Sequence, residues 1–363
     1  MKKRKIIHYS VFGNNEKGHG GQKRTNQIVN LLKKDYEVHE LQLNLLLPRN
    51  VLKLVFYFFY GIKELFQLKI RMYPTIIGLI KIGHYSYMCR TKVKLNNVAF
   101  VIVEEFRNFG AILNLYAKSK EIPVIGVAHN IDSFVPEFRS NFTNLSELKY
   151  FKEELYLLKQ CSFVITISRE ENWLLSLNKI TAIYLPFIPS KSVINELNEI
   201  KFKRESIQNK IKPLLLGTVK NIPTKIGMTK LIRNMEENRV SCDVVGFGSE
   251  SLLADFKDLL YVDIHGGVSS EELNFYLLHC TSMLVYQPPT TGVLTRVIEC
   301  LMCGIPVYGN DSSLRSYHYL DGTFNLASYK NGEERASRID LSVYYSEISD
   351  SENKIMLLIK ELL

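Results

Sequence analysis

The chain has 363 residues, of which 46% are hydrophobic and 23% charged, and its formal net charge is +9. This composition excludes a disordered or fibrous protein, and the length suits two globular domains better than one. No stretch approaches the roughly 20 apolar residues that span a bilayer, and the opening MKKRKIIHYSVFG favours a first strand over a signal peptide. Six cysteines, with only Cys300 and Cys303 closely spaced, favour reduced thiols and a cytoplasmic protein. No second pair or histidine lies near those two, so we expect them to be packing residues.

In the first half of the chain, segments with the pattern of strands alternate with segments of helical periodicity. Alternation of this kind predicts a parallel sheet with helices on both faces. Strands are expected over 5–13, 37–43, 98–105, 122–130, 163–168 and 180–186, and helices over 24–36, 146–161 and 169–177.

A basic and aromatic segment, 51–94, lies between the second and third expected strands. From Arg49 to Lys94 there are nine basic residues but one acid, Glu64, and the same stretch holds nine aromatic residues. Basic residues mixed with aromatic and aliphatic ones suit an anionic membrane surface, whereas no RNA- or DNA-binding motif accompanies them. The competing interpretation is a basic solvated face over ordinary core helices; membrane contact is the one we favour.

The second half repeats the alternation, with strands expected over 212–219, 242–249, 261–268, 282–288 and 305–310 and helices over 228–238, 269–280 and 293–303. The predicted fold class is therefore α/β, with two doubly wound, Rossmann-like domains facing across a cleft. A polar stretch, 189–206, is the expected linker, which gives domains over 1–190 and 191–345. Ligands of such sheets bind beyond the carboxyl ends of the strands.

Two groups of candidate residues follow strands of the first half. The loop GHGGQKR contains Gly20, Gly21 and Arg24, and glycines between a strand and a helix let backbone N–H groups approach a phosphate or sugar. Its spacing is not that of a dinucleotide site, and such loops are often only turns. His129 and Asp132 follow the strand ending in GVAHN, where a histidine binds a substrate hydroxyl or moves a proton, or else serves only the structure.

The other two groups lie in the second half. Lys220 and Lys225, in GTVKNIPTKIG, would neutralise a departing diphosphate, unless they are simply solvated lysines of a loop. In TTGVLTRVIECLMCGIPV, Arg296 and Glu299 are three residues apart and share one helix face. The carboxylate suits the two hydroxyls of a ribose; the alternative is a surface ion pair between the two side chains.

The same stretch would place Gly292 and Val293 at a helix N-terminus, whose N–H groups suit an anion. No D-x-D, G-x-S-x-G, H-E-x-x-H or P-loop motif occurs in the sequence. Positive charge therefore has to come from basic side chains and helix N-termini, and neither a metal nor another cofactor is expected.

Taken in chain order, these stretches resemble the GT-B glycosyltransferases of the family-4, retaining type. The resemblance is carried by the Gly-Gly loop, GVAHN, ITIS, GTVK followed by KIG, VVGFGSE, HGGVSSEEL and a G-x6-E-x4-GIPV pattern, and it covers about residues 5–320. It implies a retaining, metal-independent enzyme that transfers a hexosyl or related sugar from a nucleotide diphosphate. Members of that family often end in a helix that returns to the first domain, and the matching segment here is 346–363, with SENKIMLLIKELL.

The resemblance implies a role for each matching residue. Glu299 takes the place of the second glutamate of the E-x7-E motif, which binds the ribose, and Lys220 and Lys225 take the places of the cations on the diphosphate. His129 matches a histidine beside the transferred sugar, and the segment 246–248 lies near the nucleobase. The expected catalytic residues are His129, Lys220 and Lys225, and the expected donor-binding residues are Gly20, Gly21, Arg24, Gly246, Gly248, Thr291, Gly292, Val293, Leu294, Arg296 and Glu299.

One residue departs clearly from the family pattern. The first glutamate of E-x7-E, which touches the transferred sugar, corresponds to Thr291 here. This difference bears on the identity of the donor and, less directly, on retention of configuration. Lys220 stands where arginine is frequent, which keeps the charge but loses the two-pronged hydrogen bonding. Gly20 and Gly21 match the family's loop at the donor phosphate or the sugar.

The expected protein is a cytoplasmic glycosyltransferase, attached peripherally to the inner face of the cell membrane through 51–94. Its partners would be a UDP- or GDP-sugar, a glycan or lipid-linked acceptor and an anionic membrane surface, but no nucleic acid. Its product would belong to cell-surface polysaccharide or glycolipid synthesis. Two alternatives remain: a sugar-nucleotide epimerase or phosphorylase on the same fold, and a non-catalytic binding subunit, which Thr291 would suit.

Overall fold

The computed structural model describes residues 3–70, 74–135, 147–207, 210–256, 258–330 and 339–363. It divides into two compact units: the first comprises Met1–Pro186 and Ser349–Leu363, and the second comprises Phe187–Ile348. Each unit has a six-stranded sheet of its own. The sequence placed the boundaries at 190 and 345, a few residues from those of the units.

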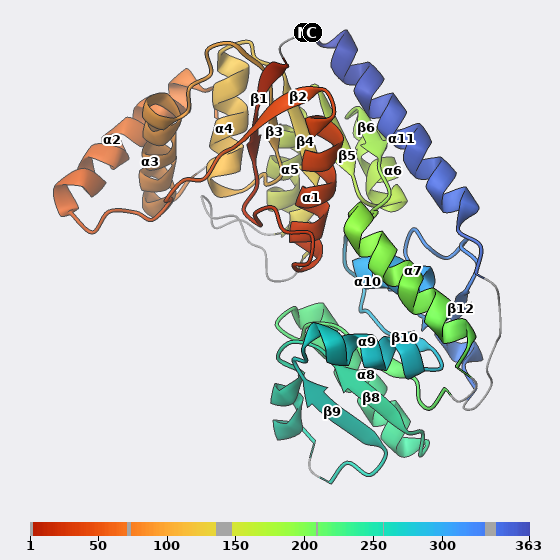
Figure 1. Cartoon of the computed structure of the whole chain (residues 1–363). Helices are drawn as coiled ribbons and strands as arrows, with labels where there is room; N and C mark the ends of the chain where they lie inside the picture. Colours follow the sequence, from red (N-terminus) through yellow and green to blue (C-terminus); the bar gives the residue numbers. More distant parts are fainter. Residues whose placement is uncertain (1–2, 71–73, 136–146, 208–209, 257, 331–338) are drawn as a thin grey trace. The chain divides into compact units, whose positions relative to one another are not determined.

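The sheet of the first unit is parallel, in the order β2-β1-β3-β4-β5-β6 (Figure 1). Helices join most successive strands, as the alternation in the sequence predicts. The strands are β1 (Arg4–Tyr9), β2 (Tyr36–Glu40), β3 (Val98–Val103), β4 (Val124–Ala128), β5 (Phe163–Thr166) and β6 (Ala182–Tyr184). The helices are α1 (Gly20–Lys33), α2 (Val51–Gln67), α3 (Ile76–Lys92), α4 (Asn108–Ser119), α5 (Glu147–Leu158) and α6 (Arg169–Leu177), with a 3-10 turn, η1 (Asp132–Phe134).

Both faces of this sheet are buried, because neighbouring residues of a strand point to opposite sides. In β1, Ile6 belongs to the core that contains Ile28 of α1, whereas Ile7 belongs to the core that contains Ile82 of α3. Strands covered on both sides are continuous apolar runs, which explains the sequences VAFVIV of β3 and VIGVA of β4. Polar side chains of these strands are thus confined to their ends.

Helices α2 and α3 pack side by side as a helical hairpin, seen at the left of Figure 1. Two glycines let the backbones meet: a Cβ at Gly61 would overlap the Leu79 carbonyl oxygen, and one at Gly83 would overlap that of Tyr57. Helix α3 also packs against α4, so the hairpin is attached to the unit through α3. Within the described part of the chain, no helix is both long and apolar enough to cross a membrane.

The second unit has a parallel sheet in the order β12-β11-β10-β7-β8-β9. On one face, Leu215 and Val244 share a core with Ile232 of helix α8. The strands are β7 (Leu214–Leu216), β8 (Cys242–Val245), β9 (Val262–Gly266), β10 (Met283–Val285), β11 (Val307–Gly309) and β12 (Thr323–Asn325). The helices are α7 (Lys191–Glu205), α8 (Ile222–Glu237), α9 (Ser270–His279) and α10 (Thr295–Met302), with the 3-10 turns η2 (Ser249–Ala254) and η3 (Leu326–Ser328).

The stretch 189–206, expected as a linker, is mostly the helix α7. Ser190 caps its N-terminus by accepting a hydrogen bond from the Val193 N–H. Val193, Leu197 and Ile200 are buried at helical spacing. Charged residues surround these apolar ones, so the polar composition of the stretch predicts a linker although its apolar residues have helical spacing.

Helix α8 begins at Ile222 rather than at residue 228. The Asn221 side chain caps it, at 3.2 Å from the Thr224 N–H. Pro223 lies in the first turn, where its missing N–H costs nothing. The sequence placed Lys225 in a loop. In the structure it lies in the first turn of α8.

The last helix, α11 (Ser342–Glu361), contributes to both units. Tyr344 is completely buried in the second unit. From Ser349 onward the helix belongs to the first unit, where Ile355 and Ile359 are 0% exposed within one of the two cores of the sheet.

Candidate functional site

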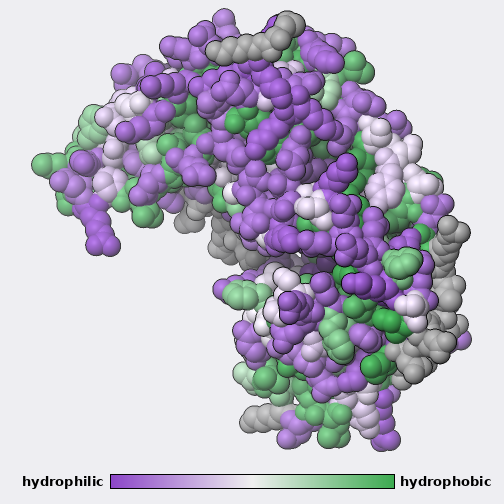
Figure 2. Space-filling view, viewed as in Figure 1, coloured by the Kyte–Doolittle hydropathy of each residue, from purple (hydrophilic) through white to green (hydrophobic). Residues whose placement is uncertain are grey.

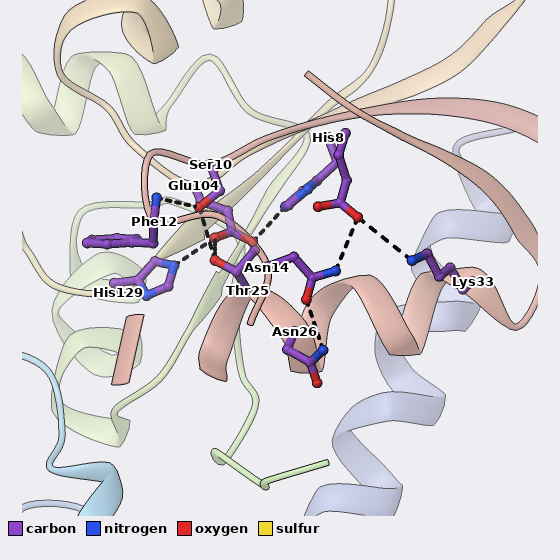
Figure 3. Close-up of polar contacts among 10 residues, drawn as sticks. His8, Ser10, Phe12, Asn14, Thr25, Asn26, Lys33, Glu104 and His129 are labelled. Carbon is purple, nitrogen blue, oxygen red and sulfur yellow. Dashed lines mark hydrogen bonds and ion pairs between the residues drawn. The ribbon is translucent and has the colours of Figure 1, made fainter. Parts of the chain in front are cut away.

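The carboxyl ends of β1, β3 and β4 bring several polar side chains of the first unit together (Figure 3). Ser10 follows β1, Glu104 and Glu105 follow β3, and His129 follows β4. The predicted residue His129 is therefore at the edge where parallel sheets of this kind bind ligands. Glu104 lies at the centre of the group.

The Glu104 side chain is completely buried and accepts hydrogen bonds from three others. Its Oε1 lies 2.7 Å from Nε2 of His8, and its Oε2 lies 2.9 Å from Nε2 of His129 and 2.5 Å from Oγ1 of Thr25. Burial alone would raise the pKa of Glu104, but the two histidines hold it well below its ordinary value. Because an ionised carboxylate only accepts hydrogen bonds, both histidines donate from Nε2.

Phe12 connects the predicted Gly-rich segment to His129. Its ring centroid lies 4.9 Å from that of His129, and a Cβ on Gly21 would come within 2.8 Å of the ring. The absence of a side chain at Gly21 thus gives the ring its room. Gly20 and Gly21 form the start of α1 rather than a loop, and the Phe12 ring packs against both Gly21 and His129.

Arg24, predicted to contact the donor, lies in the interior of the first unit. It is 0% exposed, and its guanidinium donates to Gln27 Oε1 at 2.6 Å, to the Thr166 carbonyl at 3.3 Å and to the Pro186 carbonyl at 3.5 Å. These bonds fasten α1 to β5 and to the segment that leaves β6. In this position the side chain serves the structure, and a ligand would reach it only if these bonds broke.

A second group of charged side chains lies next to this network. Nε of Arg107 is 2.9 Å from Oδ2 of Asp132 and 3.7 Å from Oε1 of Glu105. The Glu154 carboxylate accepts two backbone N–H bonds, at 2.7 and 3.0 Å, from the start of η1. Burial raises the pKa of Glu105 to about 7 and that of Glu154 to about 8. These four side chains line one small pocket with His129.

Glu104 and Glu105 were absent from the predicted site, although the sequence carried a signal for them. VAFVIVEE ends an apolar strand with two acids, at the edge where the rule that selected His129 applies. His8 gave no such signal, because it lies within β1 and not after it. Its role depends on β1 and β3 being neighbours in the sheet.

Glycines form much of the carboxyl edge of the second sheet. Gly217 follows β7, Gly246 follows β8 and Gly266 ends β9, with φ of +153°, +148° and +77°. The Cβ of any other residue at Gly246 would overlap the carbonyl oxygen of Gly217. Gly248, also predicted to bind the donor, is the N-cap residue of η2 and has φ of +83°. This edge therefore presents mainly backbone groups, which a flat or charged ligand approaches closely.

Arg296, also predicted to bind the donor, packs against Gly217 at this edge. A Cβ at Gly217 would overlap its Nη1. Its Nε is buried without a hydrogen bond, and no ion pair or hydrogen bond joins the guanidinium to another described residue. Burial lowers the pKa of Arg296 to about 10. The alternative of a surface ion pair with Glu299 is therefore wrong.

The two predicted lysines lie on the surface of the second unit. Nζ of Lys220 is 4.5 Å from the centroid of the exposed Phe247 ring, just after β8. Nζ of Lys225 is 3.7 Å from Oδ2 of Asp255, and both side chains are nearly half exposed. Such an exposed ion pair contributes less than about 1 kcal/mol, so Lys225 can exchange Asp255 for another anionic partner at little cost.

Residues 291–293 form the turn before α10, and Leu294 is the N-cap residue. The helix begins at Thr295, two residues later than predicted. Gly292 has φ of +76°, and its carbonyl accepts a hydrogen bond of 3.4 Å from Arg315. Its positive φ suits glycine and turns the chain into the helix.

Among the described residues, no three histidine, cysteine or carboxylate side chains are placed to hold a metal ion. Cys300 and Cys303 are free thiols, buried on α10 and at its end. Burial raises the pKa of both thiols. Their positions agree with the packing role expected from the sequence.

No protein-family model matches this sequence, and no curated protein matches it. Several solved structures resemble it in fold. Sucrose-phosphate synthase from Thermosynechococcus elongatus has a TM-score of 0.54 at 13% identity, over 99% of this chain and 93% of its own. HepE of Anabaena, solved in complex with UDP-glucose, has a TM-score of 0.54 at 14% identity, and the match covers 99% of this chain and 98% of HepE. UDP-GlcNAc 2-epimerase from Methanocaldococcus jannaschii has a TM-score of 0.52 at 12% identity, and the match covers 99% of this chain and 100% of the epimerase.

At these identities the likeness shows the fold alone. The chain has the two-domain α/β GT-B fold over its whole length, which confirms the predicted fold class. A synthase and an epimerase occur among the neighbours, so the fold by itself does not choose between their chemistries.

Proposed function

We propose that the chain is a glycosyltransferase that takes its sugar from a nucleotide diphosphate. The observation that carries this proposal is Arg296, a partly buried cation at the carboxyl edge of the second sheet whose guanidinium makes no ion pair or hydrogen bond with another described residue. A buried charge is costly unless a partner arrives, and a guanidinium binds a phosphate through two parallel N–H bonds. The N-terminus of α10 adds positive potential from the adjoining turn.

The other residues of this edge complete a donor site. Lys220 and Lys225 would bind the outer diphosphate oxygens, and Glu299 would accept two hydrogen bonds from the ribose. The backbone around Gly246 would lie against the base of a UDP- or GDP-sugar. HepE, which shares the fold, binds UDP-glucose, which supports a uridine nucleotide. Thr291 would contact the sugar as a neutral group, so the choice of donor depends on it, and no step needs a metal.

In the first unit, we propose that His129 and the segment at Gly21 lie against the transferred sugar. The Glu104 network supports this assignment, because it holds His129 in one orientation. We propose that the acceptor is a glycan linked to a lipid, because the first unit also carries the α2–α3 hairpin, for which a membrane-binding role is proposed. The product would then belong to cell-surface polysaccharide or glycolipid synthesis.

Two variants are expected to separate the parts of the donor site. Arg296→Met should weaken both inorganic diphosphate and the nucleoside diphosphate, whereas Glu299→Ala should weaken only the nucleotide. Hydrogen bonds to charged groups contribute about 1.5–3 kcal/mol each, so losses of about 10- to 100-fold in affinity are expected. Thermal shifts with diphosphate, UDP, GDP, ADP and CMP measure this, since a ligand of the native state raises its melting temperature. Arg233→Met, an exposed arginine of α8, is the control.

The outcomes of this screen also separate the alternatives. Loss of diphosphate binding in Arg233→Met, or unchanged binding in Arg296→Met, would remove the donor site from this edge. Isomerisation of a sugar nucleotide whose diphosphate stays attached would indicate an epimerase. Cleavage of the sugar from its donor by inorganic phosphate would indicate a phosphorylase. Binding with no turnover in the presence of membrane extracts would favour the non-catalytic subunit.

We also propose that the α2–α3 hairpin binds an anionic membrane surface. The outward side of α2 carries large apolar side chains at helical spacing, each about half or more exposed, and the start of α3 adds two more. Figure 2 shows hydrophobic patches among hydrophilic ones at the outer end of the hairpin, on the left. The apolar residues are Val51, Leu52, Val55, Phe56, Phe59 and Phe66 of α2 and Ile76 and Ile77 of α3.

The charge of the hairpin supports an anionic partner. Glu64, the single acid from Arg49 to Lys94, is buried, and both of its oxygens accept hydrogen bonds of 3.1 Å from Arg90. Its charge is therefore neutralised inside the unit. Lys53 and Lys63 are exposed beside the apolar side chains. Arg71, another cation of the segment, lies outside the described residues.

Reversing two of these charges should release the protein from anionic vesicles. Each basic residue contributes about 1 kcal/mol at such a surface, so Lys53→Glu with Lys63→Glu should lower the partition coefficient by at least about thirtyfold, and the added negative charges should lower it further. Sedimentation with vesicles of phosphatidylcholine and phosphatidylglycerol measures it. Lys120→Glu with Lys179→Glu, exposed lysines of the same unit outside the hairpin, should bind as the wild type does. Equal binding of both double variants would rule the hairpin out.

A further inference from the structure

Two adjacent glutamates at the end of β3 differ in whether their carboxyl oxygens have hydrogen-bond partners. Both carboxylate oxygens of Glu104 accept hydrogen bonds: Oε1 from His8, and Oε2 from His129 and Thr25. Glu105 is 5% exposed, yet its Oε2 is buried without any hydrogen-bond partner. A buried oxygen of this kind is costly to leave unsatisfied, and natural proteins rarely do so without a reason.

The surroundings of Glu105 satisfy only its other oxygen. Oε1 accepts a hydrogen bond of 3.3 Å from Asn108 and lies 3.7 Å from the Arg107 guanidinium. Burial raises the pKa of Glu105 to about 7, against the opposing effect of Arg107. The other titratable groups that face it are Tyr9 of β1, Tyr85 of α3, Asp132 of η1 and Tyr150 of α5. No hydrogen bond of ordinary geometry joins the Tyr9 hydroxyl to the carboxyl.

Several carboxyl groups line the pocket at the end of β3, and Glu105 differs from the others in its hydrogen-bond partners. Asp132 is paired with Arg107 at 2.9 Å, and Glu154 accepts two backbone N–H bonds. The rings of Phe12 and Phe106 supply apolar walls. Within the described residues of this pocket, Glu105 alone has a buried carboxyl oxygen with no partner, so it is the group that a ligand hydroxyl would complete.

We propose that Glu105 is the general base that binds the acceptor hydroxyl and takes its proton. This inference rests on the glycosyl transfer proposed above. As the acceptor oxygen bonds to the anomeric carbon, its proton passes to Oε2 of Glu105. The bond between the anomeric carbon and the diphosphate oxygen breaks, and its electron pair leaves with the nucleoside diphosphate. The protonated Glu105 then returns its proton to water.

The proposal has a stereochemical consequence. A separate base on the acceptor is what a single displacement needs, and such a displacement inverts the anomeric configuration. The family resemblance implied retention, but the glutamate that contacts the sugar in that family is Thr291 here. We therefore expect the product to carry the opposite anomeric configuration from the donor.

Glu105→Gln tests the assignment in the full-length protein. The amide has the same shape and cannot accept the proton, so kcat should fall about 10²- to 10⁴-fold, while the affinity for the nucleotide sugar stays unchanged. In the wild type, kcat/KM should fall as pH drops below about 7, because the base must be ionised. That acidic limb should disappear in the variant. Glu105→Asp should restore part of the rate, and Glu121→Gln, an exposed glutamate of the same unit, should match the wild type.

The outcomes distinguish this inference from the proposed function beneath it. A full rate in Glu105→Gln, an unchanged acidic limb in that variant or a product of retained configuration by NMR would overturn the role of Glu105 while leaving the transferase intact. Failure of the wild type to bind any nucleotide sugar would instead overturn the proposed function. An unchanged melting temperature of Glu105→Gln shows that the lost rate is not lost folding.

Discussion

Replacing Glu104 with glutamine is expected to lower the free energy of unfolding of the first unit by about 3 kcal/mol. Three donors converge on this carboxylate, and glutamine offers one acceptor oxygen and turns an N–H₂ group toward the others. His129 would also lose its fixed orientation, so transfer should fall on the order of a hundredfold. Urea unfolding at pH 7, followed by circular dichroism and hydrogen exchange of β1 and β3, measures the loss of stability.

The matched control is an exposed pair of the same chemistry. Nε2 of His39 lies 2.9 Å from Oε1 of Glu37, with side chains 45% and 51% exposed. Glu37→Gln should cost less than about 1 kcal/mol, because water screens the pair. Equal costs for Glu104→Gln and Glu37→Gln would mean that burial of the network contributes nothing to stability.

The stabilisation by Glu104 should also depend on pH. The pKa of Glu104 is lower in the folded protein than in the unfolded chain, so its contribution is complete above the ordinary pKa of glutamate, about 4.3. It is lost as the pH falls below that value toward the folded pKa. The difference between wild type and Glu104→Gln should therefore shrink between about pH 5 and pH 2, and a constant difference would contradict the assignment.

Gly246→Ala is expected to destabilise the second unit by about 3 kcal/mol or more and to abolish nucleotide binding. The position has φ of +148°, which costs other residues about 1–3 kcal/mol, and the new Cβ would overlap the Gly217 carbonyl oxygen. A backbone atom cannot swing aside as a side chain does, so the ends of β7 and β8 must separate. Arg296, which packs against Gly217, would move with them.

Gly267→Ala is the control for this prediction. Gly267 lies in the loop after β9, and a Cβ there would come no closer than 3.4 Å to Phe247, an ordinary contact. Its substitution should change stability by less than about 0.5 kcal/mol. Differential scanning calorimetry and a titration with UDP measure both variants, and similar results for the two would mean that the edge tolerates a side chain at Gly246.

Local patterns were enough to predict most of the fold. The apolar runs of β3 and β4 and the strand–helix alternation are properties of short segments, so both sheets were recognisable. The sequence pattern does not predict helix α7, because its three buried apolar residues lie within a stretch of polar composition. The α2–α3 hairpin was not resolved into helices, because its aromatic residues lie on its exposed side as well as its buried one.

The site was less predictable, because its contacts join residues far apart in the sequence. His8 and Glu104 are 96 residues apart, and they meet only because β1 lies beside β3 in the sheet. The same holds for Arg24, whose burial depends on carbonyl groups 142 and 162 residues away. Glu105 is different: its position after an apolar strand was visible, but the missing partner of its Oε2 is a property of the packed structure alone.

The last helix has a consequence for how the protein is made. Ile355 and Ile359 complete a core whose other buried members lie in the first 185 residues, so the N-terminal unit has no finished core until α11 has been translated. A ribosome that adds 5–20 residues per second needs about 10–30 s to pass through the second unit. During that time the second unit is able to fold as a contiguous segment, whereas the first waits with one face of its sheet partly uncovered. The unit whose synthesis begins first is therefore the one whose core is completed last.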